Sequence, residues 1–206
     1  MSLNEGPIRL IMALRNKGIV DTNILSAFEK VPREVFLPNI SSQNLWSDTH
    51  HHLENGIILS RPYISAYLLT ALEIKPRDRV LQLPTGTGYC SALISHLCRW
   101  IYTKDNNRFY CKEASERIRF LNIPNIITKF GDTDMGWEEQ APFDRILLND
   151  GIDEVPDYLI NQLQHDGVLV APVGPDKSMR TIVKLKKNKD SFVKEKLMTL
   201  TPSITG

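Results

Sequence analysis

The sequence has few cysteines, no excess of charge of either sign and no long apolar run. Its three cysteines, at positions 90, 98 and 111 of 206, are an odd and scattered set that does not predict a disulfide framework. Basic residues number 25 and acidic residues 24, so nothing predicts attraction to nucleic acid. No stretch reaches the roughly 18 apolar residues of a membrane span, and the first residues do not resemble a secretory signal. These absences predict a reduced, cytoplasmic protein without membrane or nucleic-acid partners.

Repeats and metal-ligand patterns are also missing. The chain shows no internal repeat, and its 42% hydrophobic and 24% charged residues are typical of a globular protein. His50, His51 and His52 form a histidine run, but no second ligand pair stands at the spacing of a zinc site. We therefore expect no metal, and a length that suits one domain with at most a small extension.

The first third of the chain has helical spacing interrupted by prolines. Apolar residues predict a helix over residues 7–17 and a second helix after Asp21, which can cap it. Pro32 and Pro38 break this pattern, so we expect a loop with short extended pieces up to about residue 59. A further helix is expected after Pro62.

From residue 79 onward, short apolar strands alternate with helical segments. Strands are predicted at residues 79–83, 100–103, 126–130, 145–148 and 168–171. This alternation is typical of an α/β protein with a doubly wound, mainly parallel sheet and helices on both faces. Two last extended runs, 181–185 and 192–197, predict a hairpin that adds an antiparallel edge to the sheet.

The carboxyl ends of the predicted parallel strands supply the candidate binding site. Residues 84–88, PTGTG, form a turn in which glycine lets the backbone approach a ligand. Asp105 ends the next strand about 20 residues later, where a carboxylate can accept hydrogen bonds from ribose hydroxyls. The third glycine of the dinucleotide motif is replaced by Ser91, which favours S-adenosylmethionine over a dinucleotide without excluding the latter.

Several motifs spread along the chain carry a family resemblance. They lie at residues 14–19, 31–38 (VPREVFLP), 60–64 (SRPYI), 80–89, 131–137, 141–146 (APFDRI) and 171–174 (APVG). In this order they resemble the protein-L-isoaspartate O-methyltransferase family over nearly the whole chain. VPREVF and APFDRI are the most specific of these motifs.

The resemblance implies a Rossmann-like, S-adenosylmethionine-dependent methyltransferase fold. Residues 1–62 would form an N-terminal helical extension with the substrate loop, and residues 63–206 the cofactor-binding α/β domain, within one compact unit. The cofactor would be S-adenosylmethionine, and the methyl acceptor the carboxylate of isoaspartyl residues in damaged proteins, which the reaction repairs. Because members of the family are usually monomers, we expect a monomer.

The resemblance also implies roles for particular residues. Ser60 is the candidate catalytic residue, whose hydroxyl would position the substrate carboxylate. Cofactor contacts are expected from Gln82, Pro84, Thr85, Gly86, Thr87, Gly88, Asp105, Asn106, Asp132 and Thr133. Substrate contacts are expected from Ile58, Leu59, Arg61, Asn149 and Asp150. Structural alternatives are open: Ser60 and Asp105 as helix caps, Arg61 as a surface charge and Asp150 as part of a solvated turn.

The chain departs from the family pattern at some of these positions. Gln82 stands where the family has an acidic residue, Pro84 where it has glycine, and Ile58 where it has a hydroxyl. Asn149 and Asp150 replace small residues, and a carboxylate there would repel an isoaspartyl carboxylate but suit an amine or hydroxyl acceptor that must lose a proton. A methyltransferase with another acceptor, and a non-catalytic scaffold that has lost the site, therefore stay open as alternatives.

Overall fold

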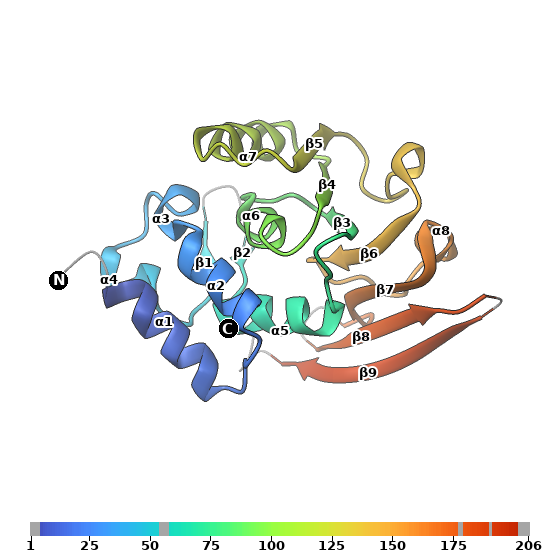
Figure 1. Cartoon of the computed structure of the whole chain (residues 1–206), viewed down its shortest axis with the longest axis horizontal. Coiled ribbons are helices and arrows are strands. Elements are labelled where there is room, and N and C mark those ends of the chain that lie inside the picture. Colours follow the sequence, from blue (N-terminus) through green and yellow to red (C-terminus); the bar gives the residue numbers. More distant parts are fainter. Residues whose placement is uncertain (1–4, 54–57, 177–178, 190, 202–206) are drawn as a thin grey trace.

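A seven-stranded sheet organises the molecule, which we describe from a computed structural model covering residues 5–53, 58–176, 179–189 and 191–201 (Figure 1). The strands lie in the order β5-β4-β3-β6-β7-β8-β9, and β3 to β7 pair in parallel while β8 and β9 are antiparallel. They are β3 (Arg79–Leu83), β4 (Trp100–Asp105), β5 (Ile126–Phe130), β6 (Phe143–Leu148), β7 (Leu163–Val173), β8 (Arg180–Lys187) and β9 (Phe192–Leu200). This architecture confirms the predicted mainly parallel sheet with an antiparallel C-terminal edge.

Alternating side chains of the central strands feed two hydrophobic cores, one on each face of the sheet. Val80, Ile101 and Leu147 belong to one core, whereas Leu81 and Ile146, which pair with each other, belong to the other. Both cores are built from side chains that are almost completely buried. The near-continuous apolar sequence of these strands is explained by burial on both faces.

Helices cover both faces of the sheet. The first core includes side chains of α1 (Glu5–Asn16), α2 (Thr22–Lys30), α5 (Pro62–Leu72) and α6 (Tyr89–Ser95). The second core includes Leu159 of α8 (Asp157–Asn161) and Trp137, which precedes the 3₁₀ helix η2 (Glu138–Gln140). The remaining long helix, α7 (Arg108–Phe120), packs on β4 and β5.

The N-terminal segment contains more regular structure than the expected loop. Asp21 caps α2 as predicted, since its Oδ1 accepts hydrogen bonds from the backbone N–H of Asn23 (2.8 Å) and Ile24 (3.3 Å). The pair β1 (His51–His52) and β2 (Ile58–Leu59) provides the expected short extended pieces, whereas α3 (Arg33–Phe36) and α4 (Ser42–Leu45) were not predicted. Buried tertiary contacts stabilise these short pieces: the Nε of Arg33 donates to the carbonyl of Leu45 (2.7 Å). Four-residue helices have no periodicity that the sequence could reveal.

Within the described residues, none of the helices has both the length and the apolar character needed to cross a bilayer. The same part of the chain contains no group of three histidine, cysteine or acidic side chains placed to hold a metal ion.

Candidate functional site

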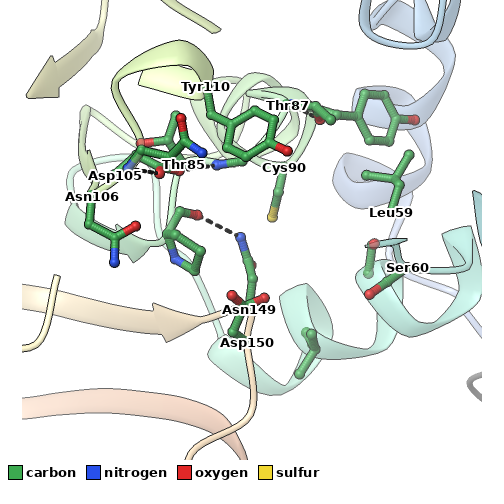
Figure 2. A pocket seen from close by; sticks show the side chains of 16 residues that line it. Leu59, Ser60, Thr85, Thr87, Cys90, Asp105, Asn106, Tyr110, Asn149 and Asp150 are labelled. Atoms are coloured by element: carbon green, nitrogen blue, oxygen red, sulfur yellow. Dashed lines mark hydrogen bonds between the residues drawn. The ribbon is translucent and has the colours of Figure 1, made fainter. Parts of the chain in front are cut away.

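Two adjoining hollows form a trough at the carboxyl edge of the sheet, where β3, β4 and β6 end. Their volumes are about 430 and about 410 Å³. Pro84, Asn106 and Asp150 line both hollows, so the two share a border. Figure 2 shows the first hollow, with Asn106 on one side, Ser60 on the other and Asp150 between them.

Most of the residues predicted from the sequence come together in this trough. Those that line the first hollow are Leu59, Ser60, Pro84, Thr85, Gly86, Thr87, Asp105, Asn106, Asn149 and Asp150. Thr133 lines the second hollow. Four predicted residues line neither hollow: Arg61, Gln82, Gly88 and Asp132. Ile57 and the side chain of Ile58 lie outside the described residues.

The turn between β3 and α6 forms one wall of the first hollow. Its backbone is tied to β4, since the N–H of Thr85 donates to the carbonyl of Lys104 (2.9 Å). Gly88 has a φ of +86°, and a Cβ there would lie 3.1 Å from the Cβ of Ala114 on α7. The turn therefore needs glycine at position 88 both for its conformation and for the close approach of α7.

Gln82 lies beneath this turn rather than in the trough. Its side chain is completely buried, and its Oε1 accepts hydrogen bonds from the hydroxyls of Ser91 and of Thr103 (3.2 Å). Its Nε2 donates to the carbonyl of Pro84. Gln82 therefore acts on the trough through the shape of the turn, because all of its amide atoms are engaged inside the protein.

Asp105 ends β4 and places its carboxylate beside the turn. Its Oδ2 accepts a hydrogen bond from the N–H of Gly86 (2.8 Å) and its Oδ1 one from the N–H of Asn107 (2.9 Å). The cap of α7 is Asn107, whose side chain accepts from the N–H of Phe109 (2.9 Å). The structural alternative for Asp105, a cap of the following helix, is therefore wrong, because Asn107 caps α7. Each of its oxygens accepts one protein hydrogen bond and keeps a further lone pair for a ligand.

Ser60 faces the same hollow from the opposite side. It follows β2 and precedes α5, whose N-cap is Arg61. The hydroxyl of Ser60 makes no hydrogen bond with the part of the chain that the structure describes, and it does not cap α5. Asp48 performs that task, because its Oδ1 accepts from the N–H of Tyr63 (2.8 Å). The free hydroxyl of Ser60 is therefore available to a ligand.

Arg61 points to a different partner from the one predicted. Its Nη2 lies 3.1 Å from Oδ2 of Asp48, and its Nε donates to the backbone carbonyl of the same residue (3.1 Å). Lys17 also binds this carboxylate. Although burial works in the opposite direction, the contacts with Lys17, Tyr63 and Arg61 lower the pKa of Asp48. Arg61 thus helps to fix the start of α5.

Asn149 and Asp150 follow β6 and close the trough between its two sides. The N–H of Asn149 donates to the carbonyl of Leu83 (2.8 Å), and its Nδ2 donates to the carbonyl of Pro84 (3.2 Å). Asp150 lines both hollows. Although Asp150 is exposed, partial loss of water around its carboxyl raises its pKa, and the charge of Asp105 adds to this, whereas Arg180 acts in the opposite direction.

The loop after β5, residues 131–137, borders the second hollow through Thr133. The buried Nζ of Lys104 donates to the carbonyl of Gly136 (2.8 Å), and Gln162 binds the backbone of Trp137 (2.8 Å). Asp132 lines neither hollow, and its Oδ1 accepts from the N–H of Asp134 (2.8 Å). The loop is therefore held in shape by buried side chains from β4 and from the end of α8.

Six further residues that line the first hollow were not predicted from the sequence, namely Ser65, Leu68, Tyr89, Cys90, Asn107 and Tyr110. Burial raises the pKa of the Cys90 thiol to about 12, so this side chain stays neutral. Ser65 and Leu68 lie on α5, and only helical spacing counted from Ser60 would have indicated them.

Comparisons with known proteins agree about the family. The family model described as protein-L-isoaspartate(D-aspartate) O-methyltransferase (PCMT) matches residues 7–202. The protein-L-isoaspartate O-methyltransferase of Caulobacter vibrioides is 42% identical over 174 residues, which are 84% of this chain and 78% of that protein. A solved structure of a protein-L-isoaspartate O-methyltransferase is 26% identical with a TM-score of 0.85, covering 97% of this chain and 67% of that chain. A Plasmodium falciparum protein, solved with S-adenosyl-L-homocysteine, shares the fold at 20% identity, with a TM-score of 0.77 over 94% and 96% of the two chains.

Proposed function

Because the chain belongs to the protein-L-isoaspartate(D-aspartate) O-methyltransferase family, we propose that it transfers a methyl group from S-adenosylmethionine to isoaspartyl carboxylates of damaged proteins. The observation that carries this proposal is the trough itself, in which the Asp105 carboxylate and the free Ser60 hydroxyl line one hollow. The first is suited to a nucleoside and the second to a carboxylate. The proposed role is protein repair.

The residues of the trough fit the proposed cofactor. Asp105 would accept hydrogen bonds from the ribose hydroxyls with the lone pairs that Gly86 and Asn107 leave unused. Further contacts are proposed for Pro84, Thr85, Thr87 and Asn106 in the first hollow and for Thr133 in the second. Gln82 and Gly88 would act by shaping the turn, and Asp132 stays a prediction. When bound, S-adenosylmethionine supplies a methyl group activated by the positive charge on sulfur.

Ser60 would hold the acceptor in place. A substrate carboxylate is already ionised at neutral pH, so the reaction needs no strong base. What the protein must provide is orientation of the attacking oxygen, which a fixed hydrogen-bond donor can supply. The hydroxyl of Ser60 would donate to one carboxylate oxygen and leave the other to attack. Leu59, Ile58 and Asn149 would border the substrate, and Arg61 would contribute by fixing the start of α5 through Asp48.

The wider setting of the protein is also a proposal. We expect a cytoplasmic monomer that acts on isoaspartyl proteins or peptides and binds neither nucleic acid nor membranes. Residues 1–62 would carry the substrate loop, and residues 63–206 the cofactor site.

One observation favours a second candidate acceptor. The raised pKa of Asp150 suits a base that removes a proton from an amine or a hydroxyl. If Asp150→Ala abolished methylation of such an acceptor while isoaspartyl peptides gave no signal, this alternative would replace the first.

The direct test is transfer of labelled methyl groups to an isoaspartyl peptide, compared with the same peptide containing normal aspartate. We expect labelling of the first peptide only. Ser60→Ala should lower kcat/KM about tenfold or more because a hydrogen bond to a charged group is lost. Ser191→Ala is the matched control, because Ser191 is exposed at the β8–β9 turn, far along the chain from the trough. No labelling by folded wild-type protein would reject the proposal.

A further inference from the structure

The trough presents negative charge to a substrate that is itself an anion. Asp105 and Asp150 line the first hollow, and Asp134 and Glu154 line the second. Among the described residues, neither hollow is lined by a lysine or an arginine. The sulfonium of the proposed cofactor offsets part of this charge, and a cation of the protein beside the trough would further lower the repulsion of an isoaspartyl carboxylate.

Most cations near the trough are already engaged. Arg61 and Lys17 both bind Asp48, and the buried ammonium of Lys104 donates to the carbonyl of Gly136. These groups hold the protein together and cannot turn toward a ligand without breaking those contacts.

Arg180 is differently placed. It begins β8, whose antiparallel pairing of Thr181 with Val173 brings Arg180 to the carboxyl edge of the sheet. Its Nε donates to the carbonyl of Gly174 (3.2 Å), while its two terminal nitrogens have no hydrogen-bond partner within the described part of the chain. Its charge is close enough to Asp150 to influence the ionisation of that carboxyl.

Gly151 makes room for this arginine beside the trough. A Cβ on Gly151 would lie 1.9 Å from Nη1, 2.2 Å from Cδ and 2.4 Å from Cζ of Arg180, so no other residue at position 151 is compatible with this arrangement. Gly151 itself lines the second hollow, next to Asp150. The guanidinium thus lies directly behind the wall that Asp150 and Gly151 form.

We propose that Arg180 is a specificity-determining residue whose guanidinium, packed behind Gly151, offsets the charge of Asp150 and so lets the trough accept the carboxylate of the isoaspartyl substrate. Because Arg180 lines neither hollow, it acts through its charge and not through direct contact with the substrate. This inference rests on the proposed function, because it assigns a partner to the anionic acceptor of that reaction. It also makes Asp150 compatible with such an acceptor.

The test is a double-mutant cycle with steady-state kinetics on an isoaspartyl peptide. Arg180→Gln should raise KM about three- to tenfold, because the charge of Asp150 is then no longer offset, and leave the Kd for S-adenosylhomocysteine within about twofold. Asp150→Asn should lower KM, and the double variant should return toward the wild-type value. Arg119→Gln, which removes an exposed arginine of α7, is the matched control and should change nothing.

Each outcome decides between charge compensation and a merely structural role. A KM within about twofold of wild type in Arg180→Gln, or a double variant no better than Arg180→Gln alone, overturns the inference while the proposed function stands. If Arg180→Gln fails to fold, Arg180→Lys serves instead: it keeps the positive charge, so its KM should stay within about twofold of wild type, and a larger rise overturns the inference. Wild-type protein that does not methylate the peptide rejects the proposed function, and the inference with it.

Discussion

Replacing Gln82 by the acidic residue that the family has at this position should destabilise this protein. The amide of Gln82 accepts from Ser91 and Thr103 with one end and donates to the carbonyl of Pro84 with the other. Gln82→Glu keeps an acceptor for the two hydroxyls. It places its second oxygen against the Pro84 carbonyl, where two acceptors meet without a proton in a completely buried site.

The size of the effect follows from one lost hydrogen bond and one buried acceptor left without a donor, which together cost about 1–3 kcal/mol. For a protein of about 200 residues, this lowers the melting temperature by roughly 2–12 °C. The deficit should depend on pH. Burial raises the pKa of the introduced carboxyl above its unfolded value of about 4.3, so the native state of the variant binds the proton more tightly than the unfolded state. The protonated carboxyl can donate to Pro84, and the deficit therefore shrinks as the pH falls.

Thermal unfolding of Gln82→Glu and wild type at pH 7.5 and at pH 5 measures both effects. Gln164→Glu introduces the same change at an exposed position of β7 and serves as the control for net charge. A variant as stable as wild type at both pH values would show that the Pro84 carbonyl does not need the amide. A deficit that grows on acidification would refute the proposed protonation.

Three more predictions concern buried or half-buried charged groups. Asp105→Asn should weaken binding of S-adenosylhomocysteine by about 10- to 100-fold in calorimetry, because the loss of charge weakens hydrogen bonds to the ribose. Asp48→Asn should cost about 1–3 kcal/mol of unfolding free energy at pH 7. Lys17 and its neighbours lower the pKa of Asp48 below 3.8 despite burial. In urea unfolding, the difference in stability between wild type and Asp48→Asn should therefore shrink as the pH falls through that lowered pKa. Burial and the charge of Arg33 lower the pKa of His51 from 6.5. The stability of the wild type should therefore fall as the pH drops below about 6.5, and the His51→Gln variant should lose less stability over the same range.

The sheet was predictable because its strands are buried on both faces and leave unbroken apolar runs in the sequence. The strands at residues 79–83 and 126–130 have the predicted bounds. The strand predicted at residues 168–171 extends over Leu163–Val173, because its first residues include Gln164 and His165, which are exposed and carry no apolar signal. Strand ends that face water are set by pairing with neighbours rather than by hydrophobicity.

The cofactor side of the trough was also within reach of the sequence, since topology places the ends of parallel strands at one edge. Asp105 and the turn before α6 meet there for that reason. The substrate side was harder to predict. Arg61 neighbours Ser60 in sequence and suggested a partner for a carboxylate, but its side chain binds Asp48. Arg180 is 120 residues from Ser60 in the sequence. Only the pairing of β7 with β8 brings it next to Gly151, behind the wall of the trough.

Two of the departures from the family pattern, Gln82 and Asp150, have a partner elsewhere in the structure. The amide of Gln82 supplies the donor that the carbonyl of Pro84 accepts, which a carboxylate at position 82 could not do at neutral pH. The carboxylate of Asp150 is accompanied by Arg180, for which Gly151 leaves the space. The hydrogen bonds of Gln82 stabilise the turn in a scaffold as well as in an enzyme, so only the cation behind the trough bears on an anionic acceptor. Gln82→Glu therefore tests the stability of the turn, whereas Arg180→Gln tests whether the site is adapted to an anionic acceptor.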